Sequence, residues 1–166
     1  MLPEEVAKFI GTGSGVTVFE VEKGAVKKFA DAVDDPNPLY WDEEHAKNSR
    51  YESIIAPPGF FGWPVKMAKG STFLRAEQPE GTSEAMGNVG VALAKAGYLR
   101  SLDGGMEYEF FCPVRAGDTL AATTVIKDIR ERVGQTGNLA FMIRETTYFN
   151  QNGELVAKAR ATSIHR

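Results

Sequence analysis

Eight residues carry the strongest structural signal in this chain: Asp35-Pro36-Asn37-Pro38-Leu39-Tyr40-Trp41-Asp42. They place a carboxylate, an amide and a phenol close together in the sequence. Each proline fixes its own φ and pushes the residue before it away from the helical region. We therefore expect Asp35 and Asn37 to be extended and to form a rigid elbow after a helix.

The residues on either side of this elbow predict an α+β protein. Residues 16–21 alternate in polarity and are rich in β-branched side chains, which indicates a strand. In residues 23–33, one apolar stripe recurs at helical spacing, and Asp42 is the expected N-cap of a second short helix. The stripe consists of Val26, Phe29, Ala30 and Val33. Four strand-length runs separated by turn residues follow, at 106–111, 119–132, 139–149 and 155–164.

Composition excludes several classes of protein. A net charge of −3 and a pI near 5.5 argue against a general nucleic-acid binder, which shows a basic face. The single cysteine, Cys112, excludes an internal disulfide framework and suits a reducing cytoplasm. No apolar run approaches the roughly 20 residues that span a bilayer, and the N-terminus lacks the basic start of a secretory signal. We expect a soluble, cytoplasmic protein with one domain over residues 1–166.

The elbow resembles the signature of the MaoC-like, (R)-specific enoyl-thioester hydratases, Asp-x-Asn-Pro-Leu-His-x-Asp. Seven of the eight positions are met, and the exception is Tyr40, which stands at the histidine position. Residues 105–120 are similar to the second block of this family, which leads to Pro113-Val114 and Gly117-Asp118. The resemblance implies a hot-dog fold, in which an antiparallel sheet wraps around one central helix. Residues 62–104 form a longer, insert-like segment than compact members of the family have.

The resemblance also implies the roles of individual residues. Asp35 matches the carboxylate that handles water, and Asn37 matches the orienting amide. The thioester oxygen would accept from the backbone N–H of Gly59 or Phe60, because Pro57 and Pro58 have none. The family uses no metal and no separate cofactor. Coenzyme A or phosphopantetheine enters only as part of an acyl-thioester substrate.

Tyr40 departs from this pattern in a way that affects catalysis. A phenol with a pKa near 10 is a poor base at neutral pH and does not replace an imidazole. We expect His45 to be a surface residue. The sequence therefore resembles the substrate-holding member of paired dehydratases, in which a second hot-dog chain keeps both Asp and His. The implied partner is a hot-dog chain, in a homodimer or in a heterodimer with an intact Asp/His hydratase chain.

Two other functions stay open at this stage. One is an autonomous hydratase in which Asp35 works with Tyr40, and the other is a catalytically silent thioester-binding or scaffold subunit. The aromatic residues Phe61, Trp63 and Tyr98 are candidates to line an acyl tunnel, although core packing explains most such residues. Residues 62–104 are expected to border the acyl tail or to cover a sheet edge or dimer surface.

Overall fold

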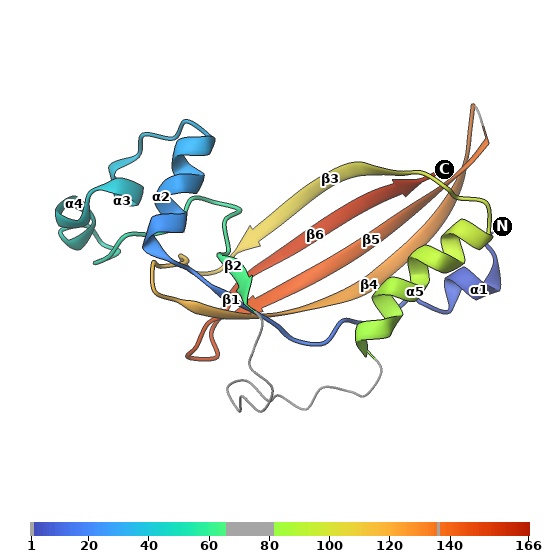
Figure 1. The fold of residues 1–166 in the computed structure, drawn as a ribbon, viewed down its shortest axis with the longest axis horizontal. Coiled ribbons are helices and arrows are strands. Elements are labelled where there is room, and N and C mark those ends of the chain that lie inside the picture. The colour runs from blue at the N-terminus through green and yellow to red at the C-terminus, as the bar shows by residue number, and fades with distance from the viewer. Residues whose placement is uncertain (1, 66–81, 136) are drawn as a thin grey trace.

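The structure is a computed structural model that describes residues 2–65, 82–135 and 137–166. Its described strands form one antiparallel sheet in the order β2-β1-β4-β5-β6-β3 (Figure 1). The strands are β1 (Thr17–Glu20), β2 (Trp63–Val65), β3 (Ser101–Phe110), β4 (Thr119–Gly134), β5 (Gly137–Phe149) and β6 (Leu155–His165). The helices are α1 (Glu4–Ala7), α2 (Lys23–Ala32), α3 (Pro38–Trp41), α4 (Glu43–Lys47) and α5 (Thr82–Lys95). The predicted α+β class is confirmed.

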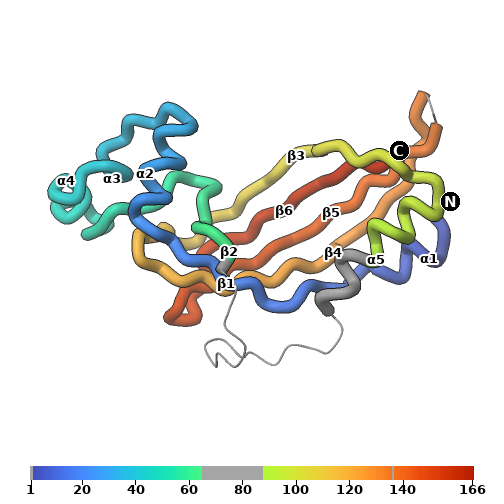
Figure 2. The backbone as a smooth tube through the Cα atoms, viewed as in Figure 1, coloured from blue at the N-terminus to red at the C-terminus, as the bar shows by residue number. Residues whose placement is uncertain are grey.

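The four C-terminal strands make up most of the sheet, as their alternating sequence predicts. β4 and β5 pair along almost their whole length, β5 pairs with β6, and β6 pairs with β3. Register shifts occur between Ile126 and Asp128 and between Asp103 and Gly105. Such bulges increase the local twist, which suits the curled sheet seen in Figure 2.

Helices cover the two ends of the sheet separately (Figure 1). At one end, α1 and α5 pack over β4 and β5 in a cluster that includes Val6, Leu93, Ile126 and Met142. At the other end, α2, α3 and α4 gather beside the start of β4 and β6. Among the described residues, no helix is long and apolar enough to cross a membrane.

The predicted apolar stripe of α2 is buried over most of its length. Val26 and Ala30 are fully buried and Phe29 is partly buried, but Val33 is 53% exposed. Val33 was expected to be buried with the others, and it is not, because the helix ends at Ala32. The next residue, Asp34, adopts a positive φ of 53° that turns the chain away from the helix axis.

A layer of aromatic rings lies between α2 and the sheet. Phe29 of α2 packs on Phe60, with ring centroids 5.0 Å apart. The adjacent Phe61 stacks on Tyr148 of β5, with centroids 4.1 Å apart and planes 11° apart. Figures 1 and 2 show α2 at the end of the sheet rather than along its middle, where the resemblance implied a central helix.

Candidate active-site cavity

The elbow that follows α2 is held by hydrogen bonds between residues that are close in the sequence. The N–H of Asp35 donates to the carbonyl of Ala30 at 2.9 Å, and the N–H of Asn37 donates to Asp35 Oδ1 at 3.1 Å. Asn37 is extended, with φ −57° and ψ 120°, as the following proline predicts. The indole N–H of Trp41 donates to the carbonyl of Asp35 at 2.9 Å and closes the elbow from the other side.

Pro38 begins the one-turn helix α3, which the sequence analysis did not predict. Asn37 is its N-cap and accepts from the N–H of Leu39 at 3.1 Å. Proline is favoured at the first position of a helix because its missing N–H is not needed there. The N-cap and the proline together point to a helix start, so this signal was available in the sequence. Asp42 caps the next helix, α4, as predicted.

Tyr40, the residue at the family's histidine position, is buried in α3 with 6% of its surface exposed. Burial raises the pKa of its phenol, and the nearby carboxylate of Asp35 raises it further. A hydrogen bond with the side chain of Asn37 acts in the opposite direction. The net effect keeps the phenol neutral at physiological pH, so Tyr40 offers a hydrogen-bonding group rather than a base.

A cavity of about 560 Å³ opens beside Tyr40. It brings together three of the predicted site residues, Asn37, Tyr40 and Phe60. Its other described lining residues come from α3, the loop 50–58, and the end of β3 with the segment that follows it: Leu39, Arg50, Tyr51, Ile55, Ala56, Pro57, Pro58, Phe110, Phe111, Cys112, Pro113 and Val114. Most are apolar, and among these described residues Arg50 alone is charged. Apolar walls with few polar groups are typical of small-molecule sites.

Asp35 does not line this cavity. It borders a separate hollow of about 320 Å³ together with Asp31, Asp34 and Trp41. Asp35 is half-buried, and one of its oxygens is engaged with the N–H of Asn37. Asp35 is therefore close enough to Tyr40 to affect the pKa of the phenol, but it lines a different hollow from the cavity that Tyr40 lines.

The loop before β2 supplies the two candidate oxyanion donors, and they differ in availability. The N–H of Phe60 donates to the carbonyl of Pro57 at 3.0 Å and is therefore used within the loop. In the part of the chain that the structure describes, the N–H of Gly59 has no hydrogen-bond partner. Gly59 has a φ of +90°, and a Cβ added at this position would lie 3.6 Å from the ring of Tyr108.

The three aromatic residues predicted to line an acyl tunnel lie in different environments, and the first two are in the loop before β2 and at its start. Phe61 is buried against Tyr148, and Trp63 is 60% exposed, with its ring edge-on to Phe60 at 6.0 Å. Between them, Gly62 has a φ of +84°, and a Cβ there would lie only 2.3 Å from the carbonyl oxygen of Glu20. The close approach of this loop to the end of β1 therefore requires glycine.

Tyr98 is not brought to the cavity. It lies in the cluster between α5 and the sheet at the far end, and its hydroxyl donates to Glu131 Oε1 at 2.6 Å. Burial and this carboxylate raise the pKa of Tyr98 to about 12. Of the segment 62–104, β2 and α5 are described, whereas 66–81 lie outside the described residues, as does any contact they make with an acyl tail.

The cavity also contains residues that sequence reasoning missed. Arg50 stacks over the ring of Tyr51, 4.7 Å from its centroid, and both line the cavity. Cys112, whose thiol pKa is raised by burial, lines it from the segment after β3. Arg50 and Tyr51 lie in a loop, where no periodicity marks a residue. Cys112 stands inside the second family block, which was a usable signal.

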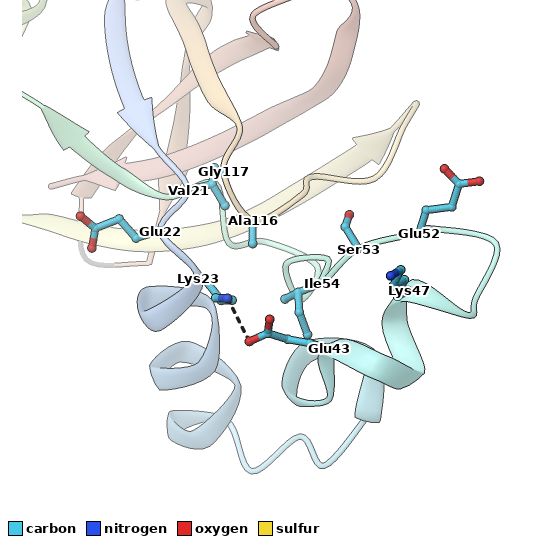
Figure 3. A pocket seen from close by; sticks show the side chains of 10 residues that line it. All are labelled: Val21, Glu22, Lys23, Glu43, Lys47, Glu52, Ser53, Ile54, Ala116 and Gly117. Carbon is cyan, nitrogen blue, oxygen red and sulfur yellow. Dashed lines mark hydrogen bonds and ion pairs between the residues drawn. The ribbon is translucent and has the colours of Figure 1, made fainter.

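A further hollow of about 530 Å³ holds none of the predicted site residues (Figure 3). Lys23 and Glu43 point toward one another across it, with Nζ and Oε1 2.9 Å apart. Lys47, Glu22 and Glu52 add charges of both signs. Among the described residues, no group of three or more histidine, cysteine or acidic side chains is placed to hold a metal ion.

Comparison with solved structures identifies the fold. The chain superimposes on one chain of the ChsH1–ChsH2 complex from Mycobacterium tuberculosis with a TM-score of 0.73 and 17% identity. The match covers 92% of this chain and 83% of that chain. The HadBC (3R)-hydroxyacyl-ACP dehydratase complex from the same organism gives a TM-score of 0.64, at 22% identity, over 94% and 96%. The predicted MaoC-like hot-dog fold is confirmed.

Sequence comparison identifies the family. The model of the FAS1-like dehydratase domain region matches residues 8–159, and the chain belongs to this family. A UPF0336 protein from Thermobifida fusca is 34% identical over 116 residues, which are 70% of this chain and 66% of that protein. A probable enoyl-CoA hydratase alpha subunit from Thermomonospora curvata is 26% identical over 96% of this chain, which spans only 51% of that protein's length.

Proposed function

We propose that this chain is the substrate-holding subunit of a heteromeric enoyl-thioester hydratase or 3-hydroxyacyl-thioester dehydratase of the cytoplasm. It binds the acyl thioester in the cavity beside Tyr40, and a second hot-dog chain with an intact Asp/His pair performs the chemistry. The family membership and the likeness to two heteromeric complexes support this assignment.

The observation that carries the proposal is the state of Tyr40. Hydration adds a hydroxyl to the β-carbon of the enoyl thioester and a proton to the α-carbon, so a group must take a proton from water and another must deliver one. A buried phenol whose pKa is raised does neither efficiently at neutral pH. Asp35 borders a different hollow and is engaged with the elbow. The partner's Asp and His would supply both steps.

The cavity supports the binding half of the proposal. Its walls are mainly apolar, which suits an acyl chain, and the exposed guanidinium of Arg50 suits a phosphate of coenzyme A or phosphopantetheine. The N–H of Gly59, which lies between the cavity-lining residues Pro58 and Phe60 in the sequence, is the candidate donor to the thioester carbonyl, because that of Phe60 is already donated to Pro57. Hydrogen-bond donors at this position polarise the carbonyl for a reaction at the adjacent carbons.

Two alternatives are tested by the same experiments. An autonomous hydratase would use Asp35 with Tyr40, an alternative that rests on the proximity of these two side chains. A silent scaffold subunit would keep the fold without binding the thioester. The first predicts turnover by the chain alone, and the second predicts no affinity for acyl thioesters.

Binding of dodecanoyl-CoA to the isolated chain, measured by isothermal titration calorimetry, tests the proposed role. We expect saturable binding that Arg50→Gln weakens about tenfold, which corresponds to one lost charge-assisted contact of roughly 1.4 kcal/mol. Arg100→Gln is the matched control, because Arg100 is also an exposed arginine but lies at the far end of the sheet. Absence of any binding by the folded chain would favour the scaffold function instead.

A further inference from the structure

The described helices leave the middle of one face of the sheet uncovered. This face carries Met142 of β5, in the cluster under α5, and Tyr148 of β5, which stacks on Phe61. Two rows of paired residues cross the same face between them: Tyr108, Ala159, Thr146 and Thr124, and then Met106, Ala161 and Arg144. These seven residues belong to neither hydrophobic cluster, and Met106 and Tyr108 are 52% and 42% exposed. Figure 1 shows the described helices over the two ends of the sheet.

The two rows are largely apolar on β3 and polar on β5. Met106 and Tyr108 stand on β3, and alanines are their partners on β6. On β5 the rows reach Arg144 and Thr146, and Thr146 Oγ1 lies 2.8 Å from Thr124 Oγ1 of β4. A pair of hydroxyls uses only one of its two protons, so the other proton is available to a further acceptor. The uncovered face therefore combines an apolar half with a cluster of hydrogen-bond donors.

Arg144 is the unusual member because its charge has no partner. Its Nε is closed to solvent and has no acceptor, and its guanidinium forms no ion pair with any residue that the structure describes. Asp103, an acidic residue of β3 on this face, accepts from the N–H of Gly105 at 2.9 Å instead. Burial lowers the pKa of His165, and the positive charge of Arg144 lowers it further. A buried donor without an acceptor is costly, more so when it is charged, so Arg144 favours an acceptor supplied by a ligand.

We propose that Arg144 and Thr146 form a binding site for the carboxylate of an amphiphilic acid, whose alkyl tail lies across the alanines of β6 towards Met106 and Tyr108. This site shares no residue with the cavity beside Tyr40. It goes beyond the proposed function, because it recognises a carboxylate rather than a thioester.

The ligand matches the site in shape, charge and length. A carboxylate is planar and accepts two parallel hydrogen bonds from one edge of a guanidinium, so it would satisfy Nε of Arg144 together with a terminal nitrogen. The side chain as a whole is half-buried, so the guanidinium can be approached from the uncovered face. One arginine balances one negative charge, which favours a carboxylate over a phosphate dianion. β3 lies two strands from β5, about 10 Å across the sheet, which an alkyl tail of medium length spans.

Binding of dodecanoate and of neutral 1-dodecanol to the folded chain, measured by isothermal titration calorimetry without coenzyme A, tests the site. We expect wild type to bind dodecanoate at least about tenfold more tightly than 1-dodecanol. Arg144→Gln should abolish this preference and leave the affinity for 1-dodecanol nearly unchanged. Arg132→Gln is the matched control and should keep the preference, because Arg132 is an exposed arginine on the opposite face of β4.

Two further variants keep the test decisive if Arg144→Gln folds poorly. Arg144→Lys retains the charge but loses the two parallel donors, so the preference for dodecanoate should fall to an intermediate value. Arg50→Gln should keep the preference, because Arg50 lines the other cavity. Loss of the preference in Arg50→Gln, with full retention in folded Arg144→Lys, would place the carboxylate beside Tyr40 and overturn the proposal. Equal affinity of wild type for dodecanoate and 1-dodecanol, or no binding of dodecanoate, would also overturn it.

A carboxylate with an alkyl tail has two sources, a free acid and the far end of a bound acyl group, and dodecanedioyl-CoA distinguishes them. Tighter binding of dodecanedioyl-CoA than of dodecanoyl-CoA, with the difference lost in Arg144→Gln, would assign the carboxylate to the acyl group. Equal binding of the two thioesters, beside a clear preference for dodecanoate over 1-dodecanol, would assign it to a free acid. The preference for dodecanoate is measured without coenzyme A, so its absence is distinct from failure of the proposed function.

Discussion

The phenol of Tyr40 and the carboxylate of Asp35 are coupled: burial raises the pKa of the phenol, and the charge of Asp35 raises it further. In the family pattern an imidazole occupies the position of Tyr40 next to this carboxylate. An imidazole in such a place is stabilised in its protonated form by Asp35, whereas the phenol is held neutral. On the role proposed for this elbow, the phenol of Tyr40 offers a hydrogen-bonding group where the family pattern has a proton-transfer pair.

Restoring the imidazole tests whether the rest of the elbow is still competent. We expect Tyr40→His to raise the rate of hydration of crotonyl-CoA by about 10²-fold over wild type, the lower end of typical acid–base contributions. The rate is followed by loss of enoyl-thioester absorbance. Adding Asp35→Asn to the variant should remove the gain. A folded Tyr40→His protein with wild-type activity would show that the side chain of Asp35, in its separate hollow, is unsuited to catalysis.

Two glycines should respond in opposite ways to replacement by alanine. Gly62→Ala should lower the free energy of unfolding by about 2 kcal/mol or more, because the new Cβ would lie 2.3 Å from the carbonyl oxygen of Glu20 at a positive φ. Gly24→Ala, in α2 with open space around it, should raise it by about 0.5–1 kcal/mol. Urea denaturation measures both, and equal effects would contradict the described path of the loop.

Tyr98→Phe should separate stability from binding. The lost hydroxyl donates to Glu131, so we expect a decrease of about 1 kcal/mol in the free energy of unfolding. Affinity for dodecanoyl-CoA should be unchanged, because Tyr98 lies in the cluster under α5. Tyr51→Phe, within the cavity, is the comparison for binding. A loss of affinity in Tyr98→Phe but not in Tyr51→Phe would show that Tyr98 contributes to the substrate site.

His165 should make stability depend on pH. Burial and the positive charge of Arg144 lower its pKa in the folded state from the usual 6.5. The unfolded chain then binds more protons than the folded one, so this contribution is present above pH 6.5 and is lost as the pH falls through the lower folded-state pKa. His165→Gln should flatten the change in unfolding midpoint between about pH 7 and 5.

Local sequence signals predicted the elements of this fold well, because each has a local cause. Three of the late strands lie where the alternating runs place them, while β3 begins at Ser101, earlier than the run at 106–111. Asp42 caps α4, and the prolines hold Asn37 extended. Helix α3 was missed, because the two prolines were considered only for their effect on Asp35 and Asn37, although Asn37 and Pro38 also form a good helix start.

Long-range relationships were harder to predict, since they depend on how distant segments pack. No local sequence pattern indicates that the hydroxyl of Tyr98 donates to Glu131 beneath α5. None indicates that Phe60 and Phe61 pack between α2 and the sheet. The family resemblance correctly led to the fold, and it directed attention to Tyr40. It did not indicate Arg50, which lies outside both family blocks and reaches the cavity only through the fold of its loop.

The most direct test of the proposed role is a hydration assay of the isolated, folded chain with dodecenoyl-CoA, run beside binding of dodecanoyl-CoA to the same preparation. The account predicts saturable binding together with turnover that is at least about 10²-fold below that of a hydratase with an intact Asp/His pair. Robust turnover by the chain alone, abolished by Asp35→Asn, would show that Asp35 and Tyr40 suffice and would contradict the substrate-holding role.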